Sequence, residues 1–323
     1  MRKVTVLGGG TGTFVVLSGL KKYPIDLAVI VSMMDSGGST GKLRDQLGVL
    51  PPGDLRQCLV ALSEAPVLWR KLFLYRFRSG DLAGHNFGNV FLSALEKVSK
   101  DYNEVVDTAS YVLQTRGQVI PVTFMKAQLC CEYDDGKIVK GEGKIEEIID
   151  PSKKIKKIYL DKKIEPNEKA IDRLKETDFI VIGPGDLYTS IAPILLVPKI
   201  KQTITSSKAK VIFIMNLMTK AGQTHGFSAN DHLRVLEQLL DKKIDIVIVN
   251  DGLIPKEIVD WYASQNEHPV INDLDNKSAK LAVVRKDVVS KRKITPKTED
   301  KLARSILRHD PDRLAKVIKE IIS

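Results

Sequence analysis

Several features that would place this chain in a well-marked class of protein are absent from it. Three cysteines in 323 residues, Cys58, Cys130 and Cys131, are too few for a disulfide framework and lack the spacing of a zinc site. No apolar run approaches the ~18 residues that a membrane-spanning helix needs. The chain starts with Met-Arg-Lys and a strand-like run, without the apolar region of a signal peptide. These absences predict a cytoplasmic protein with buried, free thiols.

Both common nucleotide-binding signatures are incomplete. Gly8-x-Gly10 lacks the third glycine of the dinucleotide fingerprint, and residues 37–42 do not have the spacing of a Walker A loop. The first glycine cluster alone is therefore either a phosphate-binding turn or only a tight turn. A dinucleotide such as NAD stays open as a ligand on the general logic of the fold.

Aromatic residues are scarce, at 6% of the chain, and few of them lie among its lysines. The formal net charge is nevertheless +10, from 50 basic and 40 acidic residues, with lysines spread over residues 153–163, 199–210 and 286–297. Without a nucleic-acid-reading motif, this distribution favours a solvated surface or a small anionic ligand. Nucleic-acid binding is the weaker alternative, and it would show as an affinity that falls steeply with salt.

What the sequence does contain begins at its amino terminus. A short β-branched run at residues 4–7 meets a glycine cluster and then a helical apolar pattern. Such a strand–glycine–helix unit directs backbone N–H groups and the positive end of a helix at a phosphate. A second run, residues 27–32, enters another glycine loop, and we expect the two loops to form the floor of a nucleotide site. The candidates there are Gly9, Gly10, Thr11, Gly12, Asp35, Ser36, Gly37, Gly38, Ser39 and Lys42.

The same alternation recurs later in the chain. Apolar runs at residues 178–182, 211–215 and 244–249 each end in a polar glycine or asparagine loop that opens a helix. This rhythm predicts one α/β domain over residues 1–323, with a Rossmann-like, doubly wound, mostly parallel sheet and a site at one rim of it. Residues of about 118–162 are predicted to form a small β-rich insert, with a hairpin turn at Asp134-Asp135-Gly136.

The later loops supply further polar candidates for that rim. His85, in the turn at residues 84–89, either contacts a ligand or only caps and packs. The glycine loop at residues 183–190 has hydroxyls and amides that suit a phosphate or a sugar. Asp54 is expected to cap the helix that runs through Leu55. The candidates from these loops are Asp54, His85, Asn86, Asn89, Gly183, Gly185, Asp186, Tyr188, Thr189, Asn216 and Thr219.

Seven motifs, taken in order, resemble the YvcK-like gluconeogenesis factors, which are relatives of 2-phospho-L-lactate transferase. The likeness covers nearly the whole chain, and it implies a cytoplasmic protein linked to central carbon metabolism, cell-wall synthesis and cell shape. It also implies binding of nucleotide sugars, UDP-N-acetylglucosamine in particular, with contacts from Tyr262 and from a late arginine, Arg308. The motifs are GGGTGT (8–13), DSGGSTGKLR (35–44), PPGDLRQCLVAL (51–62), GHNFGN (84–89), GPGDLYTSIAPILLVP (183–198), NLMTKAGQTHGFSANDH (216–232) and VNDGLIP (249–255).

Ser36 departs from the family pattern, which usually has a second aspartate there. Metal-assisted transfer requires clustered carboxylates on a divalent ion such as Mg²⁺, so the loss of one carboxylate weakens that case. Our first hypothesis is therefore a nucleotide-sugar sensor without turnover, which signals to a regulatory protein partner that the sequence does not identify. We assign no catalytic residue and no metal ligand from the sequence, and a homo-oligomer stays open.

The alternative hypothesis is a transferase that moves a phospho-containing group from a nucleotide-activated donor to an acceptor hydroxyl. Asp35 would then hold Mg²⁺, and Asp54 or Asp186 would join it. Lys42 or Arg44 would neutralise the developing charge. Release of UDP or UMP from a nucleotide sugar would distinguish this enzyme from a sensor.

Overall fold

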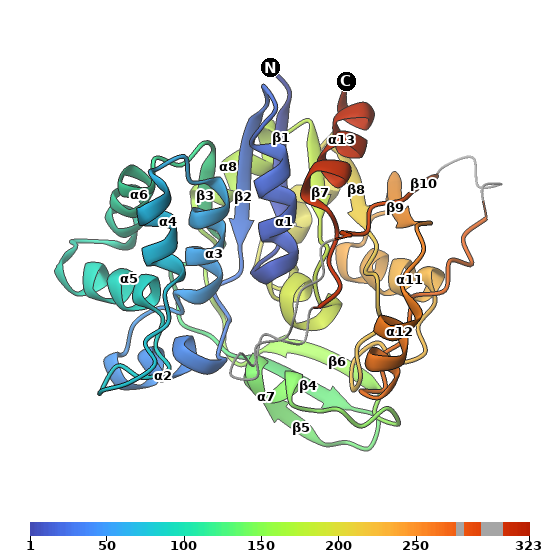
Figure 1. Cartoon of the computed structure of the whole chain (residues 1–323), viewed down its shortest axis with the longest axis horizontal. Helices are drawn as coiled ribbons and strands as arrows, with labels where there is room; N and C mark the ends of the chain where they lie inside the picture. The colour runs from blue at the N-terminus through green and yellow to red at the C-terminus, as the bar shows by residue number, and fades with distance from the viewer. Residues whose placement is uncertain (276–280, 292–305) are drawn as a thin grey trace.

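The computed structural model describes residues 1–275, 281–291 and 306–323, and within them one large sheet organises the chain (Figure 1). Its seven strands lie in the order β10-β9-β8-β7-β1-β2-β3, and every neighbouring pair is parallel. This confirms the predicted α/β fold with a mostly parallel sheet. The strands are β1 (Lys3–Leu7), β2 (Asp26–Val31), β3 (Gln118–Pro121), β7 (Phe179–Ile182), β8 (Lys210–Ile214), β9 (Ile246–Asn250) and β10 (Ala282–Lys286).

Helices cover both faces of this sheet, which is why its central strands β1 and β7 are almost entirely buried. On one face α1 packs against α3 and α13, and on the other α8 packs against α10, with α11 beside it. Their bounds are α1 (Gly10–Leu20), α3 (Gly53–Leu62), α8 (Glu168–Glu176), α10 (Ile200–Ser206), α11 (Ala229–Leu240) and α13 (Pro311–Ile322). Further helices are α2 (Gly38–Leu47), α4 (Val67–Leu74), α5 (Phe87–Val98), α6 (Tyr102–Leu113), α9 (Ala192–Leu195) and α12 (Lys256–Ala263).

The strand order reverses between β1 and β7. From β1 the chain proceeds through β2 to β3 on one side, whereas β7, β8, β9 and β10 follow one another on the other side. After β1 and after β7 the chain therefore runs toward opposite edges of the sheet. A ligand crevice is expected between the loops that follow these two strands. The two loops approach closely, since a Cβ on Gly12 would lie 2.0 Å from the carbonyl oxygen of Pro184.

A second, antiparallel sheet forms the insert at the foot of Figure 1. It contains β4 (Leu129–Tyr133), β5 (Ile138–Lys140) and β6 (Ile155–Leu160). The short helix α7 (Glu142–Glu146) lies between β5 and β6 in the chain, and the insert has a small core of its own. The hairpin turn predicted at residues 134–136 joins β4 to β5. The predicted start of the insert, about residue 118, needs correction, because β3 pairs with β2 and belongs to the large sheet.

Smaller predictions have mixed outcomes. All three cysteines are buried free thiols, as expected. No helix in the described ranges is long and apolar enough to cross a membrane. Asp54 does not cap α3, which begins at Gly53 without a side-chain cap, and its carboxylate points elsewhere. Residues 292–297 of the third lysine-rich stretch lie outside the described residues.

Candidate functional site

Carboxylates gather at the rim where the strands β1, β2 and β7 end. Asp35 follows β2 and Asp54 lies in the first turn of α3, while Glu142 and Glu146 come from α7 of the insert. The negative charges of Asp35 and Glu146 raise the pKa of both Asp54 and Glu142. Asp186, which follows β7, raises the pKa of Glu146 in the same way. The topology thus brings acidic groups from three separate parts of the chain to one place.

Asp54 turns toward the glycine cluster instead of its own helix. Its carboxylate accepts a hydrogen bond from the Gly10 N–H, and a Cβ on Gly9 would lie 2.1 Å from its Oδ2 atom. Burial and the negative charges of Asp35 and Glu146 raise the pKa of Asp54 well above its usual range. The amide end of α1 therefore already has a carboxyl oxygen as its hydrogen-bond acceptor, which an incoming phosphate would have to displace.

Asp35 occupies the corresponding position at the second glycine loop. Its Oδ1 accepts from the Gly37 N–H at 2.9 Å, and the Thr40 hydroxyl also bonds to the carboxylate. Burial raises the pKa of Asp35, although these hydrogen bonds and the positive charges of Arg56 and Arg44 oppose the shift. Lys42, in contrast, is exposed on α2.

Arg56 is the buried cation beside these two aspartates. Its Nε donates to Asn89 Oδ1 at 2.7 Å, and its Nη1 donates to the Phe73 carbonyl at 3.3 Å. Burial and the nearby charge of Arg76 lower the pKa of Arg56 to about 10, while Asp35 and Asp54 favour the charged form. Its guanidinium therefore stays cationic at neutral pH and offsets part of the acidic charge.

The polar turn at residues 84–89 packs against the second glycine loop. The Ser39 hydroxyl lies 3.3 Å from Nδ1 of His85 and accepts from the Asn86 backbone N–H at 3.2 Å. The Asn86 side chain caps α5 by accepting from the Asn89 N–H, and Asn89 Nδ2 lies 3.4 Å from the same hydroxyl. These candidates therefore lie together, in a buried hydrogen-bond network that holds the second glycine loop in place.

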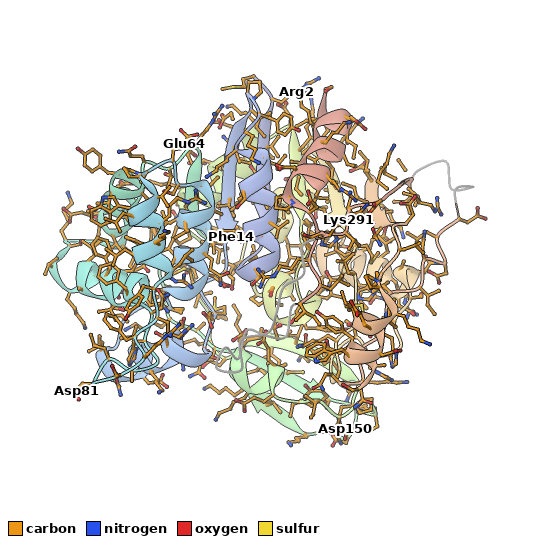
Figure 2. The ribbon with its side chains drawn as sticks, viewed as in Figure 1. Arg2, Phe14, Glu64, Asp81, Asp150 and Lys291 are labelled. Carbon is orange, nitrogen blue, oxygen red and sulfur yellow. The ribbon has the colours of Figure 1, made fainter. Side chains whose placement is uncertain are left out.

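Ser36, the departure from the family pattern, fastens the insert to the rim. Its Oγ accepts from the Gly143 N–H at 2.8 Å, and its own N–H donates to Glu142 Oε2 at 3.2 Å. A serine hydroxyl is well suited to this place because it accepts the N–H at the start of α7 without adding a charge beside Glu142. Asp150 lies at the end of the insert away from the large sheet (Figure 2).

The third glycine loop is fixed by neighbours on both sides. The Gly185 N–H donates to Asn216 Oδ1 at 3.2 Å, so the loops after β7 and β8 are joined. The Thr189 hydroxyl lies 3.4 Å from Glu146 Oε1, which links this loop to the insert. Tyr188 is buried, and Gly183 has a positive φ of +75°, a conformation that favours glycine.

Lys220 forms the cationic side of the loop after β8. Its Nζ lies 3.1 Å from Glu267 Oε1, and both side chains are only 13% exposed. Burial disfavours the ammonium, but Asp186 and Glu267 outweigh this effect and raise the pKa of Lys220. Thr219 acts structurally beside it, exchanging two hydrogen bonds with the backbone of His268.

Tyr262 lies close to this ion pair, in a small apolar cluster with Leu217, Val289 and Leu307. Its hydroxyl accepts from the Leu307 N–H at 3.3 Å. Burial raises the pKa of the Tyr262 phenol, and the charges of Glu267, Lys220 and Arg308 also act on it. The two residues implied by the family resemblance therefore lie near each other, next to the loops after β8 and β9.

Five residues of this rim were not anticipated from the sequence. Arg56 and Lys220 lie inside motifs that we quoted for other reasons, so their positions were visible but their burial was not. Glu142 and Glu146 have the i, i+4 spacing that puts two side chains on one helix face. Glu267 carries no sequence signal that we can identify.

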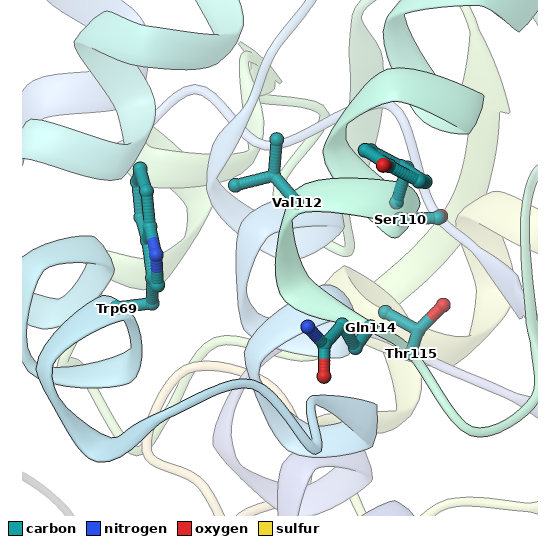
Figure 3. Close-up of a pocket in the computed structure, with 6 residues that line it drawn as sticks. Trp69, Ser110, Val112, Gln114 and Thr115 are labelled. Atoms are coloured by element: carbon teal, nitrogen blue, oxygen red, sulfur yellow. The ribbon is translucent and has the colours of Figure 1, made fainter.

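The rim has neither a ready metal-binding group nor the pocket shown in Figure 3, among the residues that the structure describes. Within residues 1–275, 281–291 and 306–323, no three His, Cys, Asp or Glu side chains are placed so that they could together hold a metal ion. The pocket in Figure 3 lies elsewhere, between α4 and the end of α6, and none of its lining residues belongs to the rim.

Removing one acidic charge from the rim is expected to stabilise the fold. A carboxyl whose pKa is raised holds its proton more tightly when folded, so its stability contribution is present at acid pH and lost as the pH rises through the raised pKa. We expect Glu142→Gln to increase the free energy of unfolding at pH 8 by about 1 kcal/mol, or about 2 °C in Tm, and by less at pH 5. Thermal denaturation at the two pH values measures this.

Glu147→Gln is the matched control, because Glu147 lies next to Glu146 but is exposed. It should leave the Tm unchanged at both pH values. A Glu142→Gln variant that was less stable at pH 8 than at pH 5, relative to the parent, would contradict the expected repulsion.

Known proteins resemble this chain in sequence and in fold. The family model for 2-phospho-L-lactate transferase CofD matches residues 4–289. The gluconeogenesis factor of Bacillus subtilis is 38% identical over 324 residues, 99% of this chain and 98% of that protein. The gluconeogenesis factor of Listeria innocua is 44% identical over 260 residues, 80% of each chain. A crystal structure of a UPF0052-family protein from Bacillus halodurans matches with a TM-score of 0.88 and 36% identity, over 98% of this chain and 99% of that one.

Proposed function

This chain belongs to the 2-phospho-L-lactate transferase CofD family, and from that premise we propose that it is a cytoplasmic regulator that binds a nucleotide sugar. The proposed ligand is UDP-N-acetylglucosamine, and the proposed setting is gluconeogenesis, cell-wall synthesis and cell shape. The relatives named gluconeogenesis factors support the metabolic setting. The observation that carries the proposal is the convergence of three glycine loops and two buried cations on the switch point of the sheet.

The loops supply the chemistry that a diphosphate needs. The ends of α1 and α2 present backbone N–H groups whose present partners are the carboxyl oxygens of Asp54 and Asp35, so the positions suit the oxygen atoms of a phosphate. Arg56 provides positive charge that acts on Asp35 and Asp54, and Lys220 provides positive charge that acts on Asp186 and Glu146. A diphosphate that replaced the Asp35 or Asp54 carboxyl would accept the same backbone N–H hydrogen bonds. The displaced aspartate would then turn to solvent or pair with a cation such as Arg56.

The sugar and base would extend toward Tyr262 and Arg308. Tyr262 is 3% exposed, so a uracil that stacks on its ring would displace part of the apolar cluster around it, and the nearby arginine offers planar donors for oxygen atoms. Because the Tyr262 hydroxyl already accepts from Leu307, the C-terminal segment around residues 306–308 would respond to a ligand there. A change in this segment would let a protein partner distinguish the ligand-bound form from the free form.

A transferase is the second candidate, and the carboxylate cluster favours it. Carboxylate oxygens are the ligands that Mg²⁺ prefers. Asp35 and Asp54, which act on each other electrostatically, would hold the ion, with Asp186 nearest the insert's acids. Mg²⁺ there would supply charge neutralisation for a departing nucleotide. The chain's own contribution would be the positioning of the donor by the loops and by Arg56.

Calorimetry with a ligand panel tests the proposal directly. The full-length chain would be titrated with UDP-N-acetylglucosamine, UDP-glucose, GDP and NAD, each with and without Mg²⁺. We expect UDP-N-acetylglucosamine to bind most tightly. Mass spectrometry after a long incubation then decides between the two candidates, because UDP or UMP release would replace the sensor with the transferase. No binding of any UDP-sugar would overturn both.

Replacement of Tyr262 separates ring stacking from the hydroxyl contact. Tyr262→Ala is expected to weaken UDP-N-acetylglucosamine binding at least ~10-fold, since base–aromatic stacking is worth about 1–3 kcal/mol. Tyr262→Phe keeps the ring and should retain most of the affinity. Melting temperatures of both variants show whether the cluster around residue 262 stays packed. Parental affinity in a folded Tyr262→Ala protein would remove this residue from the site.

A further inference from the structure

The insert lies across the end of the large sheet that carries the rim, and three loops of that sheet touch it (Figure 1). In the second glycine loop, Ser36 Oγ accepts the Gly143 N–H at 2.8 Å. The third glycine loop has a hydroxyl 3.4 Å from Glu146 Oε1. In the loop after β8, a Cβ on Gly222 would lie 2.1 Å from the Ile148 carbonyl oxygen. The insert therefore covers the ends of all three loops.

Within this contact, the insert supplies a carboxyl group to the backbone amides of the second glycine loop. Glu142 Oε2 accepts the Ser36 N–H at 3.2 Å, next to the Gly37 N–H, which donates to Asp35 Oδ1 at 2.9 Å. Two consecutive amides of this loop are thus bonded to carboxyl oxygens of the protein itself. A phosphate at this loop would need the same N–H groups. The ligand and α7 therefore compete for one position.

Electrostatic repulsion opposes the closed position of the insert. Burial raises the pKa of Glu142 and of Glu146, and the negative charge of Asp35 raises both further. Asp186 adds to the effect at Glu146, where Lys220 offsets part of it. The acids of α7 are therefore held against carboxyl groups of the rim. The oxygen anions of a diphosphate would increase this repulsion.

The connections of the insert allow it to move as one body. It has an apolar core of its own, and the chain enters and leaves it through two segments that lie side by side. Gln128 and Asp161 exchange two hydrogen bonds there, of 2.8 and 3.0 Å, and the Asn167 N–H donates to the Val122 carbonyl at 2.9 Å. Leu196 beyond α9 packs against the core of the insert. The α7 side can thus separate from the rim while this apolar contact is kept.

We propose that the insert closes the rim in the free protein, held there by the contacts of Ser36, and that its α7 side must move away before a diphosphate can bind. The identity of the ligand rests on the proposed function, whereas the opening of the insert does not. If the ligand binds only the open form, its apparent affinity is that of the open form multiplied by the fraction of molecules that are open.

Hydrogen exchange of the free, full-length protein, followed by mass spectrometry, tests the opening without a ligand. The amides of α7 and of residues 36–38 should exchange together, and faster than those of β1 and β7, because the sheet stays folded. Ser36→Ala removes the acceptor of the Gly143 N–H and should speed exchange in α7 about 5-fold, as expected for one hydrogen bond. Ser152→Ala is the control, because its hydroxyl bonds to Asp150 within the insert, and exchange in α7 should not change.

Calorimetry with UDP-N-acetylglucosamine tests the competition between ligand and insert. Ser36→Ala should bind about 5-fold more tightly than the parent, because more of the free protein is open. The double variant Ser36→Cys/Gly143→Cys fixes the insert when oxidised, since a Cβ on Gly143 would lie 3.4 Å from the Ser36 carbonyl carbon. Its oxidised form should bind at least ~10-fold more weakly than its reduced form, in which the insert can open.

Three results would each overturn the proposal. They are exchange in α7 only as fast as in the large sheet, a folded Ser36→Ala protein that binds no more tightly than the parent, and equal affinity of the oxidised and reduced double variant. A parent that binds no nucleotide sugar would overturn the proposed function instead. The exchange rates of the parent and of Ser36→Ala would then decide by themselves whether the insert opens.

Discussion

Replacing Arg173 with methionine is expected to cost about 3–5 kcal/mol of unfolding free energy, the range found when a buried ion pair loses one partner. Arg173 on α8 has a side chain only 7% exposed, and its Nη1 pairs with Asp26 Oδ1 at 2.9 Å. Its other nitrogens donate to Thr5 Oγ1 and to the carbonyls of Val4 and Asp26. One guanidinium thus joins α8 to β1 and β2, and methionine satisfies none of these acceptors.

Chemical denaturation followed by circular dichroism measures the loss. Because total stabilities of domains are about 5–15 kcal/mol, the variant should show a much lower midpoint with an unchanged slope. Arg173→Lys is the informative partner, since one ammonium can keep the Asp26 pair but not the remaining bonds, and an intermediate loss is expected. Lys175→Met on the same helix, where the lysine is exposed, should be nearly neutral. A loss below ~1 kcal/mol in Arg173→Met would show that the network adds little.

Gly12→Ala should be the most damaging of the small substitutions in the rim. The added Cβ would lie 2.0 Å from the Pro184 carbonyl oxygen, a backbone atom that cannot move without shifting the loop after β7. Overpacking of this kind typically costs 1–3 kcal/mol, and about 3 kcal/mol or more is expected where backbone meets backbone. The same shift would separate the loops after β1 and β7, so ligand binding should fall along with the Tm.

Gly37→Ala is the matched control for that substitution. Gly12 lies in the first turn of α1, and Gly37 is the residue just before α2, with a φ of −86° that is open to any residue. The nearest atom to its added Cβ would be Asp35 Oδ1 at 3.6 Å, an ordinary contact. Its Tm should therefore change little. Equal Tm values for Gly12→Ala and Gly37→Ala would mean that the close approach of the two loops does not constrain residue 12.

Much of the fold was open to prediction because its determinants are local. Apolar runs followed by glycine or asparagine loops identified β1, β2, β7, β8 and β9, and parallel strands must place their carboxyl ends at one edge. The start of α11 is also fixed locally, because Ser228 and Asp231 form a full capping box there. Only β3 was misassigned, since a four-residue strand carries no sign of which sheet it joins.

The site was predictable in its loops but not in its charges. Two pairs of the sequence motifs meet in the structure, through a contact between Ser39 and Asn89 and through a hydrogen bond from Gly185 to Asn216. The role of Asp54 was wrong at the level of contacts, since an aspartate in a first helical turn usually serves its own helix. Here the close passage of α3 past Gly9 and Gly10 supplies a better donor from another part of the chain.

By itself, the sequence determined the alternation of strand, bend and helix, the buried thiols and the family, because each depends on neighbouring residues or on ordered motifs. Tertiary structure alone decided that the acids of α7 face Asp35, that Lys220 pairs with Glu267, and that Arg173 joins three elements. Those contacts link residues 47 to 169 positions apart, as from Lys220 to Glu267 and from Val4 to Arg173. No local pattern encodes such a distance, because burial and partner choice arise only once the sheet has assembled.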